Sequence, residues 1–259
     1  MLELDAERIR LNRLIQAYLR AHALRMPEHE RFGPFLAGFD TDSDNPYQNY
    51  AIPDDDAVPD ATEIDAMIAG FAERGRKPRL EFIAMAAPRV APLLLGRGFE
   101  IEQRFPIMIA LPERLNSMAV EGIEIAIAAN DSDIVGAANV GAEAYEDATP
   151  HPDALRRLVS QGGVLMLARD RTTLEIVGMG MATAAYEGVS EVAGIGVRHR
   201  YRRRGTAAAL TAAITGEALA RGVNLVWLTP GHDDAERIYS RAGFVRASEQ
   251  LHISKNLAS

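Results

Sequence analysis

The sequence predicts an α/β protein of two similar domains, each a mixed sheet covered by helices. One observation is that segments with the apolar alternation typical of strands take turns with segments of helical spacing. Another is a repeat: the Gly-Phe pair at residues 98–99, which follows a helix, recurs at residues 243–244, an offset of 145. Gly75 and Gly222, each at the end of an earlier helix, are offset by 147. Nearly equal offsets across four elements favour two copies of one α/β unit over chance.

The boundary between the copies is predicted near residues 111–122. A strand-like run ends there at Pro112, and a new apolar alternation begins at Ile123. The predicted domains are residues 1–115 and 120–259. The elements expected in the second copy are, in chain order, strand 123–128, helix 131–146, a helical segment 152–160, strands 164–169, 174–186 and 189–197, helix 205–221, strand 223–228, helix 234–242 and strand 244–254.

Two helix ends in the second copy have sequence signals. Gly222 follows a helix, at a position where a terminal left-handed residue is expected. Asp233 and Glu236 form a D-x-x-E capping box, which predicts the start of the last helix.

Composition limits the class of protein. The chain has 259 residues, a formal net charge of -8 and no cysteine, so disulfides are excluded and a cytoplasmic location is expected. The acidic balance argues against nucleic-acid binding, and no apolar run is long enough to span a membrane. The N-terminus lacks the features of a signal peptide. The six histidines lack the H-x-H or H-E-x-x-H spacing of metal sites, so we expect no metal.

One loop of this acidic chain is strongly basic, because residues 198–204 contain five arginines. The loop follows a strand that ends at Val197 and precedes a helix rich in small residues. Backbone N–H groups and the helix dipole at such a junction attract an anion, and Gly205 allows it to approach the backbone closely. Arginines around the rim add charge-assisted contacts to phosphate oxygens. The loop therefore predicts a pyrophosphate site.

Two motifs resemble the GNAT superfamily of N-acyltransferases. Arg202, Gly205 and Ala207 form the R-x-x-G-x-A pattern of that family's acyl-coenzyme A loop. The later segment DDAERIYSRAGF is similar to the family's last helix, in which an alanine, a tyrosine four residues on and a terminal Gly-Phe recur. The resemblance spans about residues 123–254. It implies two GNAT-like folds in tandem, acetyl-CoA as co-substrate without a metal, and acyl transfer to an amine.

The resemblance also implies roles for site residues. Backbone N–H groups from Ile195 to Val197 are expected to bind the thioester carbonyl, and Tyr239 to protonate the leaving thiolate; the alternative for Tyr239 is a packing role in the core. Glu191 is the candidate base, because period-two counting places it on the same face as Ile195 and Val197; a water chain is the alternative. The residues expected to bind acetyl-CoA are Ile195, Gly196, Val197, Arg202, Arg203, Arg204, Gly205, Thr206 and Ala207.

The sequence says less about the acceptor. A primary amine of a small molecule is expected; the alternatives are a protein or peptide amine and a non-catalytic regulatory module that binds acyl-CoA. Glu143, Glu146 and Asp147 form an acidic segment that is expected to attract a cationic acceptor, unless it is a solvated surface. Arg198 and Arg200 are expected at the rim, near the ribose phosphate of the coenzyme, or in solvent.

The first copy is expected to be non-catalytic. Subtracting the repeat offset places the arginine loop over three aspartates at residues 54–56, whose carboxylates repel a pyrophosphate. Pro53 and Pro59 remove backbone donors from the same loop. Leu94 takes the place of Tyr239. We therefore expect one coenzyme for each chain.

Overall fold

Residues 2–41, 46–115, 118–146 and 149–257 are described by the computed structural model. Contacts between residues divide the chain into two units: the first comprises Met1–Ile107 and Ala247–Ser259, and the second comprises Met108–Arg246. No helix in the described ranges is long and apolar enough to cross a membrane.

Two strands contribute residues to both units. β5 (Glu100–Ala110) begins in the first unit and ends in the second, and β11 (Phe244–Ser254) begins in the second and ends in the first. The ranges predicted for the domains, 1–115 and 120–259, assign each of these strands to one domain only. The sharing arises because strand pairing joins segments that are far apart in the sequence.

The remaining elements of the first unit are α1 (Leu2–Ala23), β1 (Glu28–Phe32), β2 (Phe35–Phe39), β3 (Asn49–Pro53), α2 (Ala61–Glu73), β4 (Arg79–Ile83) and α3 (Val90–Leu95). Its strand order is β1-β2-β3-β4-β11-β5, with β3 and β4 parallel. Every residue of β2, β3 and β4 is buried, as expected for strands that are covered on both faces.

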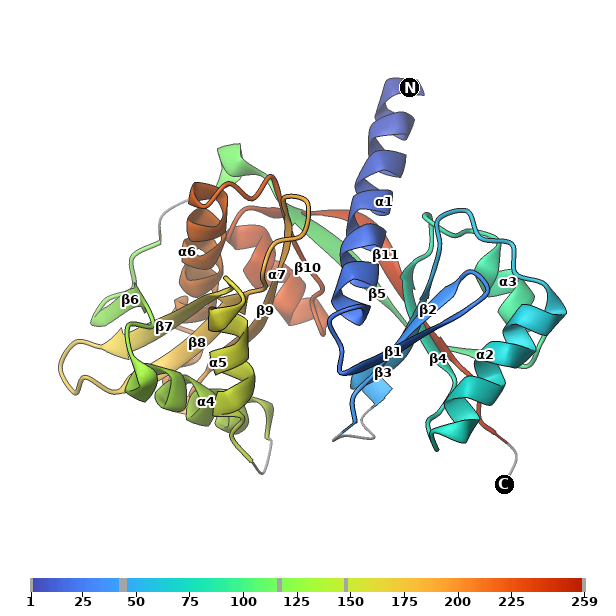
Figure 1. Ribbon diagram of the computed structural model, residues 1–259. Coiled ribbons are helices and arrows are strands. Elements are labelled where there is room, and N and C mark those ends of the chain that lie inside the picture. The colour runs from blue at the N-terminus through green and yellow to red at the C-terminus, as the bar shows by residue number, and fades with distance from the viewer. Residues whose placement is uncertain (1, 42–45, 116–117, 147–148, 258–259) are drawn as a thin grey trace. The chain divides into compact units, whose positions relative to one another are not determined.

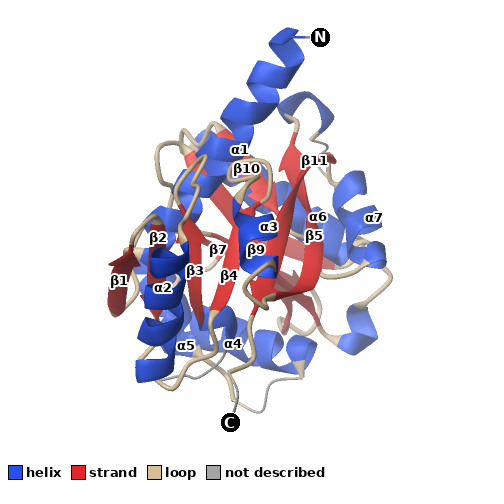
Figure 2. Cartoon of the chain, turned by 90° about the vertical axis from the view of Figure 1, so that its right-hand side faces the viewer, coloured by secondary structure: helices blue, strands red, loops and turns tan. Residues whose placement is uncertain are grey.

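Helices cover both faces of this first sheet, with α1 on one side and α2 and α3 on the other (Figure 2). Neighbouring residues of β2 mark the two faces. A Cβ on Gly38 would lie 3.2 Å from the Ala23 backbone of α1, whereas the Phe39 ring packs 4.9 Å from the Phe71 ring of α2. Alternation along the strand therefore turns successive residues toward opposite helix layers.

The remaining elements of the second unit are β6 (Ile123–Ile127), α4 (Asp131–Tyr145), α5 (Pro152–Ser160), β7 (Val164–Asp170), β8 (Ile176–Ala182), β9 (Val189–Val197), α6 (Thr206–Ala220), β10 (Leu225–Leu228) and α7 (Asp233–Arg241). Its strand order is β5-β10-β9-β8-β7-β6, and β9 and β10 are parallel. Helix α6 lies on one face of the sheet, and α4 and α5 lie on the other (Figure 1).

Two glycines of β8 allow α6 to pack closely on this sheet. A Cβ on Gly178 would lie 3.0 Å from Leu210 of α6, and one on Gly180 would lie 2.7 Å from Ile214. The first distance leaves almost no room and the second none, so larger residues would push the helix away. This packing fixes the start of α6 beside the end of β9.

The elements predicted for the second copy are confirmed, and their ends agree within two residues except for the strand predicted at residues 174–186, which ends four residues earlier. Gly222 has the left-handed conformation expected of it, with φ +88°. The local signals that predicted these elements, namely apolar period and terminal glycines, act within a few residues and so can be read from the sequence.

The predicted capping box of Asp233 and Glu236 is wrong. Helix α7 begins at Asp233 itself, and the N-cap is the preceding residue, His232. The His232 Nδ1 atom accepts from the Ala235 amide at 3.2 Å. An imidazole nitrogen thus takes the role that a carboxylate or amide oxygen has at most helix starts.

Candidate functional site

Strand β9 contains one extra residue relative to its neighbour β8. Met181 pairs with Ala193, but Met179 pairs with Gly196, so two residues of β8 span three of β9. Gly194, inside the bulge, has φ +62°, a conformation that other L-residues rarely adopt. Bulges of this kind bend a strand and redirect its backbone groups.

The bulge overturns one expectation about Glu191. Val192, Ile195 and Val197 all pack in the core beneath α6. Strand alternation places Glu191 on the face opposite its neighbour Val192, and therefore opposite Ile195 and Val197 as well. Period-two counting was wrong because the extra residue reverses the alternation after Gly194. Glu191 is half-buried and lies on the face covered by α4 and α5.

The far end of β9 is open on the side of β10. The two parallel strands pair from Val189 to Glu191, where Glu191 meets Trp227, and no pairing continues beyond this point in the described residues. The Arg198 amide donates to Val177 of β8 at 2.9 Å. Because C=O and N–H point in opposite directions across a trans peptide, the Val197 carbonyl faces the open side.

Side chains hold the carbonyl groups at this open edge. The Val197 carbonyl accepts from Arg202 Nε at 3.0 Å, and the Ile195 carbonyl accepts from the Tyr145 hydroxyl at 3.2 Å. A second Arg202 nitrogen donates to the Ala144 carbonyl near the end of α4 at 3.3 Å. Arg202 therefore binds the strand end and the helix end together.

The five arginines of the loop have different environments. Arg198 pairs with Glu143 at 2.8 Å and with Glu175 at 3.4 Å, and Arg200 pairs with Glu175 as well. Arg198 and Arg200, which were expected at a rim or in solvent, are thus both paired with glutamates of the chain itself. Arg202, Arg203 and Arg204 form no ion pair with another described residue, and Arg202 is engaged with carbonyl groups, so the exposed Arg203 and Arg204 remain. Their charge is available to a ligand.

The start of α6 has the features of an anion site. Gly205, the N-cap, has φ +88°, makes no side-chain cap, and would place a Cβ in open space. The first N–H groups of the helix are therefore not satisfied by a capping side chain. The buried Thr206 hydroxyl also lacks a hydrogen-bond partner among the described residues. These groups, with Ala207 keeping the first turn narrow, fit the phosphates of a coenzyme.

The sequence model of the acetyltransferase (GNAT) family matches residues 134–244. This segment is a GNAT acetyltransferase domain. A GCN5-related N-acetyltransferase from Kribbella flavida is 26% identical with a TM-score of 0.80, and the match covers 95% of this chain and 96% of that one. Members of the GNAT family use acetyl-CoA as co-substrate. A search of curated protein sequences finds no match to the chain.

Two further solved structures share the fold. A GCN5-related N-acetyltransferase from Sphaerobacter thermophilus has a TM-score of 0.59 at 18% identity, over 86% of this chain and 76% of that one. A tandem GNAT protein from the clavulanic acid biosynthesis pathway has a TM-score of 0.59 at 12% identity, over 77% of this chain and 70% of that one. The predicted fold class, an α/β protein with two GNAT-like folds in tandem, is confirmed.

Tyr239 lies in α7 of the GNAT domain. The residue is half-buried, and its ring centroid is 6.4 Å from that of Phe244. Burial, with a smaller contribution from Tyr145, raises the pKa of Tyr239 to about 12. The phenol is therefore protonated at neutral pH and carries a proton that it can donate.

The acidic segment near the end of α4 is described in part. Glu143 is paired with Arg198, and Glu146 is the left-handed C-cap of α4. Asp147 lies outside the described residues. Sequence reasoning missed Tyr145 in the same segment, although its hydroxyl reaches β9. A tyrosine at a helix end has no local pattern that separates a functional phenol from a surface one.

Proposed function

We propose that the second unit is an acetyl-CoA-dependent N-acyltransferase that acts on the primary amine of a small molecule. One observation carries the proposal: the open edge of β9 leads directly to the start of α6, which has no capping side chain and lies next to the unpaired Arg203 and Arg204. An extended thioester can lie along the edge while its phosphates meet the start of α6. Ile195, Gly196 and Val197 would contact the acyl end, and Arg203, Arg204, Gly205, Thr206 and Ala207 the phosphate end, with Arg202 between them.

The chemistry then follows from the groups around β9. The neutral amine attacks the thioester carbonyl, and a C–N bond forms as the C–S bond breaks. Backbone N–H groups at Ile195 and Val197 bind the oxygen while it is negative. Glu191, or water held by it, accepts the proton that the amine loses, and Tyr239 gives its proton to the departing thiolate. The products are an amide and free coenzyme A.

We further propose that the N-terminal copy, residues 1–115, is non-catalytic. Each aspartate of its loop at residues 54–56 is already paired with an arginine. Asp54 pairs with Arg31 at 2.7 Å. Asp55 pairs at 2.7 Å with Arg20 of α1, and Asp56 pairs with Arg13 of the same helix. The loop therefore has neither the sign nor the free charge to hold a phosphate.

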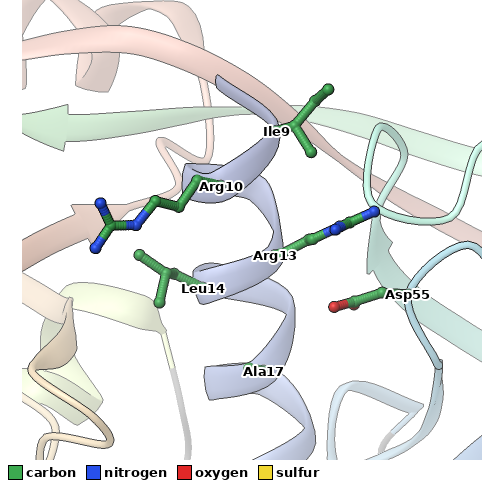
Figure 3. Close-up of a pocket in the computed structure, with 6 residues that line it drawn as sticks. All are labelled: Ile9, Arg10, Arg13, Leu14, Ala17 and Asp55. Carbon is green, nitrogen blue, oxygen red and sulfur yellow. The ribbon is translucent and has the colours of Figure 1, made fainter. Parts of the chain in front are cut away.

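Helix α1 also lies beside this loop. A shallow pocket of about 390 Å³ lies along the helix and is lined by residues including Arg13 and Asp55. Figure 3 shows Arg13 directed to the loop side of the helix, while Arg10 and Leu14 extend from the other side. The loop and the helix thus satisfy one another, which supports one coenzyme for each chain.

Titration calorimetry with coenzyme A tests the assignment through Gly205→Asp. A carboxylate there adds like charge where phosphates are expected, so affinity should fall about a hundredfold or more. The matched control is Gly222→Asp, because Gly222 ends the same helix with the same φ of +88° and equally open surroundings. The wild type and the control should bind about one coenzyme per chain. Undiminished binding by Gly205→Asp, or a second site that survives it, would contradict the proposal.

An acceptor panel distinguishes the remaining possibilities. Thiol release from acetyl-CoA is measured with small primary amines, amino acids and peptides. Release with small amines supports the proposal, and release with peptides alone would favour a protein amine. Coenzyme binding without release for any acceptor would favour a regulatory module.

A further inference from the structure

The open edge of β9 has unusual backbone freedom at its centre. Ile195 lies between two glycines, and Gly194 is already left-handed. Glycines on both sides leave the orientation of the Ile195 peptide groups weakly determined by the chain itself. On the other side of β9 the pairing with β8 is interrupted at the same residues. Something outside the strand must fix this segment if its N–H groups are to keep one direction.

Tyr145 supplies such a contact. Its hydroxyl donates to the Ile195 carbonyl at 3.2 Å. Its ring lies above Gly196, where a Cβ would be 3.8 Å from the Tyr145 Cε2 atom and 2.9 Å from the Ala144 Cβ atom. Although 60% of Tyr145 is exposed, the hydroxyl is therefore held against the strand.

The same contact has an electrostatic effect. A carbonyl oxygen on the open edge carries partial negative charge and would repel the oxygen that becomes negative during acyl transfer. A hydroxyl that donates to the carbonyl offsets part of this charge and holds it in place. Arg202 does the same for the Val197 carbonyl. The edge then presents its donors, rather than its acceptors, to the thioester.

We infer that Tyr145 is a positioning residue for acyl transfer: by binding the Ile195 carbonyl, it fixes the segment Gly194–Gly196 so that the Ile195 N–H meets the thioester oxygen. The inference rests on the proposed function, because it assigns the thioester to this edge. It needs no contact between Tyr145 and the substrate.

Steady-state kinetics of Tyr145→Phe tests the inference, since the change removes the hydroxyl and keeps the ring. The loss of one hydrogen bond that acts only through geometry should lower kcat about fivefold to twentyfold. KM for acetyl-CoA should change less than about twofold, because the phosphate contacts remain. Tyr186→Phe is the matched control: Tyr186 precedes β9, at the other end of the strand, and its kcat should equal that of the wild type.

Hydrogen exchange at the amides of Ile195 and Gly196 provides a second measurement. Exchange should be faster in Tyr145→Phe than in the wild type, and unchanged in Tyr186→Phe. Equal kcat, or a raised KM with kcat unchanged, would overturn the inference. If the wild type releases no thiol with any acceptor, the proposed function is wrong, whatever Tyr145 does. Unchanged hydrogen exchange in Tyr145→Phe would separately contradict the role of Tyr145 in fixing this segment.

Discussion

Replacing Gln16 with leucine tests whether one side chain joins two strands of the first unit. Gln16 is fully buried in α1; its Nε2 donates to the Pro53 carbonyl at 2.9 Å, and its Oε1 accepts from the Ile83 amide at 2.8 Å. Pro53 and Ile83 are the last residues of β3 and β4, whose parallel pairing includes Ala51 and Leu80. The side-chain amide thus connects the two strands at the point where both of them end.

The magnitude follows from the groups that lose their partners. Leucine has a similar size but neither donates nor accepts, so one carbonyl and one amide would be left buried. Each such group costs about 1 to 3 kcal/mol. The apolar side chain recovers about 1 kcal/mol through its own burial. Gln16→Leu should therefore lower the free energy of unfolding by about 1 to 5 kcal/mol, compared with the roughly 5 to 15 kcal/mol typical of a domain.

Two measurements check this expectation. Hydrogen exchange of the Ile83 amide should become faster, because its acceptor is removed, and urea unfolding followed by circular dichroism should show the loss of stability. Gln103→Leu is the matched control, since Gln103 is exposed on β5 of the same unit and its change should stay within about 0.5 kcal/mol. The fluorescence of Trp227, the single tryptophan, follows the second unit separately. Unchanged Ile83 exchange with stability equal to the control would refute the reasoning.

Two further predictions concern Tyr239 and His252. Tyr239→Phe should lower kcat by about tenfold or more and leave the dissociation constant of coenzyme A nearly unchanged, because the proton matters only as the thiolate leaves. If kcat is equal and the chemical step is confirmed as rate-limiting, Tyr239 has only a packing role. Burial and the neighbouring Arg79, which donates to its Nδ1 at 2.8 Å, lower the pKa of His252 from 6.5 to about 3. The unfolded chain then binds the proton more tightly, so stability should fall on acidification between these values, by about 3 kcal/mol from about pH 7 to pH 4. His252→Asn should lack this part of the pH dependence of unfolding, and equal slopes for both proteins would contradict the assignment.

The sequence predicts most of the second unit because its signals are local. The strand that ends at Val197, the left-handed Gly205 and the helix that follows can each be recognised within a few residues. The bulge could not be recognised in this way. Gly194 and Gly196 are equally plausible as strand glycines, and only the pairing with β8 reveals which of them accompanies an extra residue.

Long-range pairing explains the other differences. The roles of Arg198 and Arg200 depend on Glu143 in α4 and Glu175 before β8, which no spacing in the sequence relates to the arginine loop. The division of β5 and β11 between the units depends in the same way on which distant strands they meet. Segments that interact across the fold, rather than along the chain, are the ones that sequence reasoning misplaces.

The two loops that correspond in the repeat show why the number of charges is a poor guide to a site. The first loop has three acids, and every one has an arginine partner from its own unit. The second has five arginines, of which two pair with internal acids and Arg202 binds carbonyls. What remains is the charge of Arg203 and Arg204, next to a helix start with no cap. A ligand is attracted by charge and donors that the fold itself leaves unsatisfied, and by this criterion we expect an anion at the second loop and not at the first.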